Sequence, residues 1–230
     1  MSSLPEISIY MLSSIDGYGT GNFLEESSEL VTEYFKREYD FDSKAILCGR
    51  STFEEAQKCP VDFSQFKSEK IDRKDYEIKD EFNYYTIVID GKGKIAWPSG
   101  YFCIFEEYGR KQKAQVISIL TEDVKDEYLA YLRSVKVSYI FAGKEKVELK
   151  VALSKLKNLF GIEKILCEGG PTTNGLLIKE DLVKRLIFFK CPFLASPGGK
   201  PVFGEAKLSR WELESLYHKQ DTLILSYVKK

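Results

Sequence analysis

The chain has 230 residues, with 34 Lys and Arg against 35 Asp and Glu, a formal net charge of −1. This length is enough to fold without a disulfide or a metal, and 43% hydrophobic residues is too apolar a composition for a disordered protein. The near-zero charge argues against nucleic acid as the main partner, because phosphate binding needs a basic excess. The single histidine, His218, excludes a histidine-rich metal site within one chain and disfavours Ser-His-Asp or Cys-His catalysis.

The five cysteines form no Cys-x-x-Cys pair and their number is odd. We interpret them as reduced thiols that serve as small apolar residues, which suits a reducing cytosol. The first residues carry no basic segment followed by an apolar core, and no apolar run approaches the roughly 20 residues of a membrane span. These features predict a cytoplasmic protein.

Short apolar runs alternate with segments of helical spacing along the chain. We expect strands at 7–12, 44–49, 84–90, 101–105, 114–120, 137–141, 163–168, 183–191, 211–217 and 223–228. We expect helices at 25–39, with Ser27 or Ser28 as N-cap, after 52, at 123–133, at 146–160 and after 171. The polar segment 61–83 is interpreted as a surface excursion, with its charge run solvated, and His218 as part of a hairpin loop. The pattern predicts one α/β domain over residues 1–230, with a mainly parallel central sheet, helices on both faces and an antiparallel C-terminal hairpin.

Two turns share one design, in which an apolar strand runs into small residues and then a helix. The first is Gly49-Arg50-Ser51-Thr52, and the second runs from Glu168 through Gly169-Gly170-Pro171 to Thr173. Such turns present free backbone N–H groups and the positive end of a helix dipole, so they suit an anion. Each is equally explained as a capped strand–helix turn. Neither is a Walker A loop or a complete G-x-G-x-x-G fingerprint.

Two carboxylates follow predicted strands. Asp16 lies in the turn after the first strand, and Glu168 ends the strand 163–168. Residues at the carboxyl ends of strands face the ligand crevice of an open α/β sheet. For Asp16 the alternative is an ordinary Asp-Gly turn, whereas a Glu that ends an apolar strand needs a partner.

These motifs together resemble the dihydrofolate-reductase-like superfamily, and specifically the C-terminal reductase domain of the bifunctional riboflavin-biosynthesis deaminase/reductase. The similarity extends over nearly the whole chain, and the Glu-Gly-Gly-Pro-Thr block is its most specific part. The matching segments are Ser14–Gly17, Ile46–Glu54, Glu168–Gly175, Leu182–Pro192 and Gly198–Phe203.

The resemblance implies an NADPH-dependent reductase, usually a homodimer, with no metal. In the riboflavin branch, hydride goes to the ribose C1 of a phosphoribosylaminopyrimidine, and the carboxylates Asp16 and Glu168 would face this substrate as the catalytic residues. The residues it implies for cofactor binding are Leu12, Gly49, Arg50, Ser51, Thr52, Gly169, Gly170, Pro171, Thr172, Thr173 and Asn174.

The chain departs from this pattern at Tyr10, where the riboflavin reductases usually carry a Lys four residues before the Ser of the Asp-Gly turn. Fold and cofactor class therefore carry over better than the substrate. The alternatives are a reductase of a pterin, a dihydrofolate-like compound or another small substrate, and a catalytically inactive nucleotide-binding paralogue.

Overall fold

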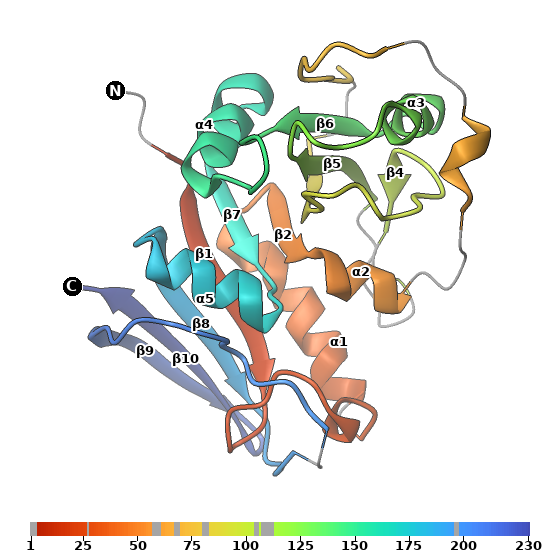
Figure 1. Cartoon of the computed structure of the whole chain (residues 1–230). Helices are drawn as coiled ribbons and strands as arrows, with labels where there is room; N and C mark the ends of the chain where they lie inside the picture. The colour runs from red at the N-terminus through yellow and green to blue at the C-terminus, as the bar shows by residue number, and fades with distance from the viewer. Residues whose placement is uncertain are drawn as a thin grey trace. The chain divides into compact units, whose positions relative to one another are not determined.

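The computed structural model describes residues 4–26, 28–56, 61–66, 70–79, 83–103, 106, 113–195 and 198–230 (Figure 1). Its internal contacts divide the chain into two compact units. Unit 1 comprises Met1–Pro5, Lys44–Cys103 and Gln112–Glu163. Unit 2 comprises Glu6–Ser43, Ile104–Lys111 and Lys164–Lys230. Each unit contains one continuous run of hydrogen-bonded strands, and the prediction of a single domain stays a prediction.

Unit 1 is built on parallel strands. Its strands are β2 (Ala45–Gly49), β3 (Tyr85–Ile89), β4 (Tyr101–Phe102), β5 (Ala114–Leu120) and β6 (Ser138–Phe141). Strands β2, β3 and β5 pair in parallel in the order β5-β3-β2, β6 adds to β5 in parallel, and β4 pairs with the start of β5 antiparallel. All seven residues of β5 are buried, which explains why five of them are apolar, with Gln115 and Ser118 as buried polar members. The helices are α2 (Arg50–Ala56), α3 (Asp126–Ser134) and α4 (Leu149–Phe160), and a 3-10 turn, η3, spans Phe63–Gln65.

The polar segment 61–83, which we expected to be a surface excursion, makes specific contacts with the sheet of unit 1. Tyr76 forms a β-bridge with Tyr139. The carboxylate of Asp75 accepts hydrogen bonds from the amide of Phe141 and the ammonium of Lys155. Charged residues here fasten a connecting segment to the sheet, so the expectation of a simply solvated charge run is wrong for this part of it.

Unit 2 holds the first and the last parts of the chain. Its strands are β1 (Glu6–Ser13), β7 (Lys164–Cys167), β8 (Val183–Lys190), β9 (Trp211–Lys219) and β10 (Thr222–Lys229). Their order is β7-β1-β8-β10-β9, in which β1 is parallel to β7 and β8, and the β9–β10 hairpin is antiparallel. The helices are α1 (Ser28–Arg37) and α5 (Pro171–Lys179), with 3-10 turns η1 (Asn22–Leu24) and η2 (Glu38–Phe41).

The alternation of side chains along β1 places the two helices of unit 2 on opposite faces of its sheet. Tyr10 points toward α1, where its ring stacks on that of Tyr34 with centroids 4.4 Å apart. Cys167, which is in register with Ile9, points the other way and contacts Asn174 of α5. Figure 1 shows α5 and α1 on either side of β1. The prediction of a mainly parallel sheet with flanking helices and an antiparallel C-terminal hairpin is confirmed.

Two smaller differences from the sequence predictions have local causes. His218 lies within β9, paired with Leu223, because the hairpin turns at Gln220, which has φ 50°. In α4, Val151 and Leu159 lie on the exposed side, so its apolar face is narrower than predicted. Ser27, one of the two candidate N-caps of α1, lies outside the described residues.

The cysteine prediction agrees with the structure where it can be compared. Cys167 and Cys191 are buried free thiols, Cys48 is buried and Cys103 is half-buried, while Cys59 lies outside the described residues. Burial raises the pKa of Cys167 to about 12 and that of Cys191 to about 11, so neither is a thiolate at neutral pH. No helix in the described part of the chain is long and apolar enough to span a membrane.

Candidate active site

The first predicted cofactor turn lies in unit 1, where β2 ends and α2 begins. Gly49 is the last residue of β2 and is buried, and Arg50 is the first residue of α2. Arg50 and Thr52 are half-buried, while Ser51 is exposed. The turn therefore offers solvent a hydroxyl and a guanidinium at the start of a short helix, the chemistry that an anion requires.

Unit 1 also contains a buried carboxylate that the sequence analysis did not single out. Asp90 follows β3 directly, and it accepts hydrogen bonds from the amides of Lys94 and Ile95 and from the hydroxyl of Tyr128 at 2.8 Å. Burial raises its pKa, while these donors and the charge of Arg50 oppose the rise. Asp90 holds the loop that follows it, and its place at the end of a predicted strand was the signal that could have marked it.

The second predicted cofactor turn lies in unit 2, between β7 and α5. Gly169 has φ 88° and a Cβ built on it would lie 3.2 Å from Sδ of Met11, so this position requires glycine. A Cβ on Gly170, by contrast, would meet no described atom within 4 Å. Gly170 is the N-cap of α5 without a side-chain cap hydrogen bond among the described residues, and Pro171 occupies the first helical turn as predicted. The start of α5 therefore has open space beside Gly170.

The remaining predicted cofactor residues of this turn differ in exposure. Thr172 is exposed and Thr173 is buried. Asn174 is fully buried: its amide nitrogen donates to the carbonyl of Val202 at 2.8 Å and its oxygen accepts from the thiol of Cys167. The side chain of Asn174 thus fastens α5 to β7 and to the loop at Val202. The predicted role of Asn174 in cofactor binding stays a prediction. The same is true of Leu12, which is buried in β1.

Asp16 lies in the exposed turn that follows β1. Its carboxylate accepts hydrogen bonds from the hydroxyl of Ser14 at 2.6 Å and from the amide of Ala195 at 3.1 Å. These two donors, with a smaller contribution from the charge of Lys190, hold the pKa of Asp16 below its ordinary value. Asp16 is therefore ionised at neutral pH and serves as a hydrogen-bond acceptor or a fixed negative charge.

Glu168 lies on the α1 side of the sheet, against a pair of tyrosines. Tyr10 donates to the carbonyl of Tyr34 at 2.6 Å, and Tyr34 in turn donates to the carbonyl of Tyr10 at 2.8 Å. The hydroxyl of Tyr34 also lies 3.5 Å from Oε1 of Glu168. Burial and the negative charge of Glu168 raise the pKa of Tyr10, so a neutral phenol stands where the resemblance expected an ammonium.

Both predicted carboxylates of unit 2 follow adjacent parallel strands. Because β1 and β7 run in parallel with Ile9 opposite Cys167, their carboxyl ends point to the same edge of the sheet. Glu168 follows β7 directly, and Asp16 comes three residues after the end of β1. Glu168 faces the tyrosine pair, whereas Asp16 is bound by Ser14 of its own turn and by the amide of Ala195. The edge thus combines a helix N-terminus with two acidic side chains, the arrangement typical of a ligand site in an α/β protein.

Comparison with known proteins defines the class first. The chain has a TM-score of 0.65 with a pyrimidine reductase-like protein from Corynebacterium diphtheriae, at 18% identity over 98% of this chain and 92% of that one. It has the same score with the riboflavin biosynthesis reductase Rib7 of Saccharomyces cerevisiae, at 17% identity over 100% and 92%. A third match is RibD of Acinetobacter baumannii, with a TM-score of 0.63 at 18% identity, of which this chain spans only 58%. The fold is therefore that of the reductase-like α/β proteins of riboflavin biosynthesis.

The family follows from the sequence itself. The model of the RibD C-terminal domain matches residues 5–225, which is nearly the whole chain. The chain belongs to the RibD C-terminal domain family.

Proposed function

We propose that the protein is an NADPH-dependent reductase of a phosphoribosylaminopyrimidine in riboflavin biosynthesis. The observation that supports this most directly is the family match over residues 5–225. The proposed reaction needs two things from the protein: backbone N–H groups that bind a phosphate, and carboxylates that bind a polar heterocycle. The edge of unit 2 has residues suited to both.

The residues present fit a dinucleotide. The space beside Gly170 is where a bound phosphate would approach the backbone, and the first turn of α5 would direct the N–H groups of Thr172 and Thr173 at it. In unit 1, the guanidinium of Arg50 and the hydroxyl of Ser51 would suit a phosphate group in the same way. The bound cofactor would supply the hydride, so the chain itself needs neither a metal nor a nucleophile.

The carboxylates then divide the work on the substrate. Asp16 is kept ionised by Ser14 and Ala195, so it would accept hydrogen bonds from the N–H groups or hydroxyls of the substrate and would not deliver a proton. Glu168 lies beside the hydroxyl of Tyr34 and would orient the heterocycle from the other side of the edge.

Tyr10 is the observation that favours a second candidate. The neutral and fully buried phenol removes the positive charge that the resemblance expects beside the substrate. A pterin, a dihydrofolate-like compound or another small substrate without a ribose phosphate needs no such charge. An inactive nucleotide-binding paralogue would keep the cofactor turns and lose the reaction.

One experiment separates these candidates. The full chain is incubated with NADPH and with 5-amino-6-(5-phosphoribosylamino)uracil or dihydrofolate, and oxidation of the nicotinamide is followed by absorbance. We expect turnover of the pyrimidine, lowered by at least about tenfold in Asp16→Asn, because a charged hydrogen bond contributes about 1.5–3 kcal/mol. Asp123→Asn, which changes an exposed aspartate of unit 1, is the matched control. Turnover of dihydrofolate alone would favour the second candidate, and NADPH binding without any turnover would favour the paralogue.

The contribution of Arg50 to cofactor binding is tested in the same preparation. Arg50→Ala should lower the affinity for NADPH by about 10-fold or more, since a guanidinium–phosphate pair is a charge-assisted contact. Arg210→Ala, which removes an exposed arginine, should leave the affinity unchanged. Equal dissociation constants for the three proteins would contradict the assignment of Arg50.

We also propose that the protein is a homodimer that uses the β9–β10 hairpin. β9 is an edge strand in unit 2, and it exposes Leu213, Leu216 and Tyr217 at 53%, 56% and 51% of their surfaces. An exposed edge strand with apolar side chains promotes pairing with a second copy. Sedimentation equilibrium should give twice the chain mass for the wild type and a lower association constant for Leu216→Lys. A monomer at all concentrations would overturn the proposal.

A further inference from the structure

A pocket of about 410 Å³ opens in unit 2 on the face of the sheet that carries Ser13. Its lining comes from the ends of β1 and β8, from the hairpin strands and from the loop that holds Val202. The lining residues are Ser13, Gly17, Leu186, Phe188, Lys190, Val202, Phe203, Trp211, Leu225 and Tyr227. This volume falls within the range of sites that take a small organic ligand.

The pocket does not coincide with the surroundings of Glu168. Ser13 and Lys190 are opposite each other in the β1–β8 register, as are Met11 and Phe188, so these side chains share one face. Tyr10 lies on the other face, where it meets α1. The pocket therefore lies across the sheet from the tyrosine pair, and the reductase proposal does not assign it.

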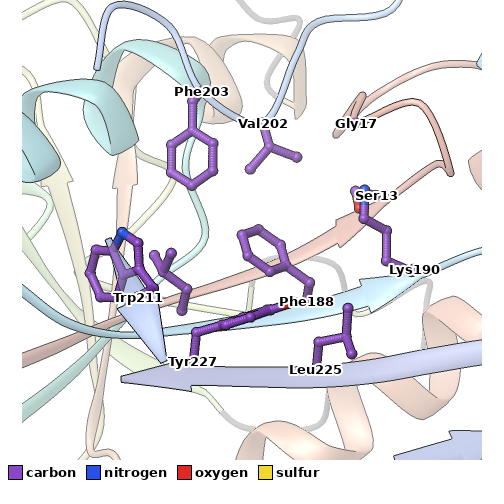
Figure 2. A pocket seen from close by; sticks show the side chains of 10 residues that line it. Ser13, Gly17, Phe188, Lys190, Val202, Phe203, Trp211, Leu225 and Tyr227 are labelled. Atoms are coloured by element: carbon purple, nitrogen blue, oxygen red, sulfur yellow. The ribbon is translucent and has the colours of Figure 1, made fainter. Parts of the chain in front are cut away.

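Most of the lining is aromatic. Figure 2 shows Phe188 and Tyr227 on the strand side of the pocket, Phe203 on the loop side and Trp211 at one end. The rings of Phe188 and Phe203 meet edge to face with centroids 6.0 Å apart. Flat aromatic walls bind a planar aromatic ring better than a flexible chain, because stacked and edge-to-face contacts add to the burial of apolar surface.

The end opposite Trp211 is polar and positively charged (Figure 2). The ammonium of Lys190 donates to the carbonyls of Ser14 at 3.1 Å and Ile15 at 3.4 Å, and an ammonium has a third N–H to offer. Partial burial lowers the pKa of Lys190, a cost that an anionic ligand would offset. The hydroxyl of Ser13 lies at the same end, is fully buried and has no hydrogen-bond partner among the described residues. A buried donor of this kind gains from an added acceptor.

We propose that this pocket binds a planar aromatic carboxylate, with the ring packed against the contacting pair Phe188 and Phe203 and the carboxylate on Lys190. The aromatic walls select the ring, and the charge at one end selects the acid over its amide. None of the lining residues belongs to the cofactor turn Gly169–Asn174, so we expect the pocket to take this ligand with or without NADPH.

The test compares 2-naphthoate with 2-naphthamide, which differ in charge but hardly in shape, by isothermal titration in the absence of NADPH. The wild type should bind the carboxylate about 10-fold more tightly than the amide. Lys190→Met should abolish this preference, whereas Lys184→Met, which removes an exposed lysine of the same strand paired with Glu6, should retain it. Thermal unfolding of each variant establishes that it is folded.

A second variant tests the location. Leu225→Trp places a larger side chain in the pocket from β10 and should weaken both ligands by about 10-fold or more. The proposal is overturned if the wild type binds neither ligand up to about 1 mM, if Lys190→Met still prefers the acid, or if Leu225→Trp binds both as the wild type does. NADPH titration of the same proteins is independent, so failure of the pocket proposal is distinguishable from failure of the reductase proposal.

Discussion

Substitution by alanine should have different effects at the two consecutive glycines before α5: a loss of stability at Gly169 and a loss of NADPH affinity at Gly170. Gly169→Ala places a side chain at φ 88°, with its Cβ 3.2 Å from Sδ of Met11 and 3.3 Å from Nδ2 of Asn174. The backbone conformation alone costs about 1–2 kcal/mol, and the contacts add to it because Met11 and Asn174 are both buried. We therefore expect Gly169→Ala to lose about 2–3 kcal/mol of stability.

Gly170→Ala should leave the fold intact. Its φ of −68° is open to any residue, and its Cβ would meet no described atom within 4 Å. The stability change should stay within about 0.5 kcal/mol, as for an ordinary surface substitution. A bound phosphate would occupy the same space, so the methyl group should cost the complex about 1–3 kcal/mol, or about 5- to 150-fold in NADPH affinity. Gly170→Val should cost more.

Two measurements on each variant test this reasoning. Thermal unfolding should place Gly169→Ala about 4–12 °C below the wild type, at about 2–4 °C per kcal/mol for a chain of this size, and Gly170→Ala within about 2 °C of it. Titration with NADPH should give a larger dissociation constant for Gly170→Ala than for the wild type. Wild-type affinity in a folded Gly170→Val protein would refute the placement of the cofactor phosphate at α5.

Two other predictions concern stability. Tyr34→Phe removes the hydroxyl that donates to the buried carbonyl of Tyr10 and should lower the free energy of unfolding in urea by about 1–2 kcal/mol. Tyr217→Phe, at an exposed residue, should change it by less than about 0.5 kcal/mol. Equal losses in the two variants would show that the Tyr34 hydroxyl does not stabilise the fold. The pKa of Glu214 is lowered from 4.5 to about 2, mainly by its hydrogen bond to Arg185, so this contribution is complete above about pH 4.5 and is lost as the pH falls towards 2. Because the pair is partly exposed, Glu214→Gln should melt only about 1–3 °C below the wild type at pH 7, and this difference should narrow in acid; a difference independent of pH would contradict the ion pair.

The parallel strands were predictable because each is a buried apolar run that ends at a turn. β5 occupies the predicted 114–120, and β2, β3 and β7 differ from their predicted ranges only at the ends. Gly161 ends α4 in the left-handed conformation, as its position after the last periodic residue indicated. Local patterns carry this information because burial on both faces leaves no polar alternation.

The site was less predictable because its contacts join residues far apart in the chain. The sequence indicated that Asp16 and Glu168 lie at strand ends. No local pattern indicates that Glu168 faces the Tyr34 hydroxyl or that the side chain of Asn174 donates to the carbonyl of Val202. The aromatic pocket depends on the loop at Val202 crossing a sheet face, which is a tertiary contact. Asp90 could have been predicted as a candidate, since it ends the predicted strand 84–90 as Glu168 ends the strand 163–168.

The order in which unit 2 receives its strands has a consequence for synthesis on the ribosome. β1 is the first strand made, yet its two partners, β7 and β8, come after all of the strands of unit 1. The pairs among β2, β3, β4, β5 and β6 can form before Lys164 emerges, whereas the apolar segment Glu6–Ser13 waits for Lys164 and beyond. Chains that stop before Lys164 should therefore aggregate through an unpaired β1.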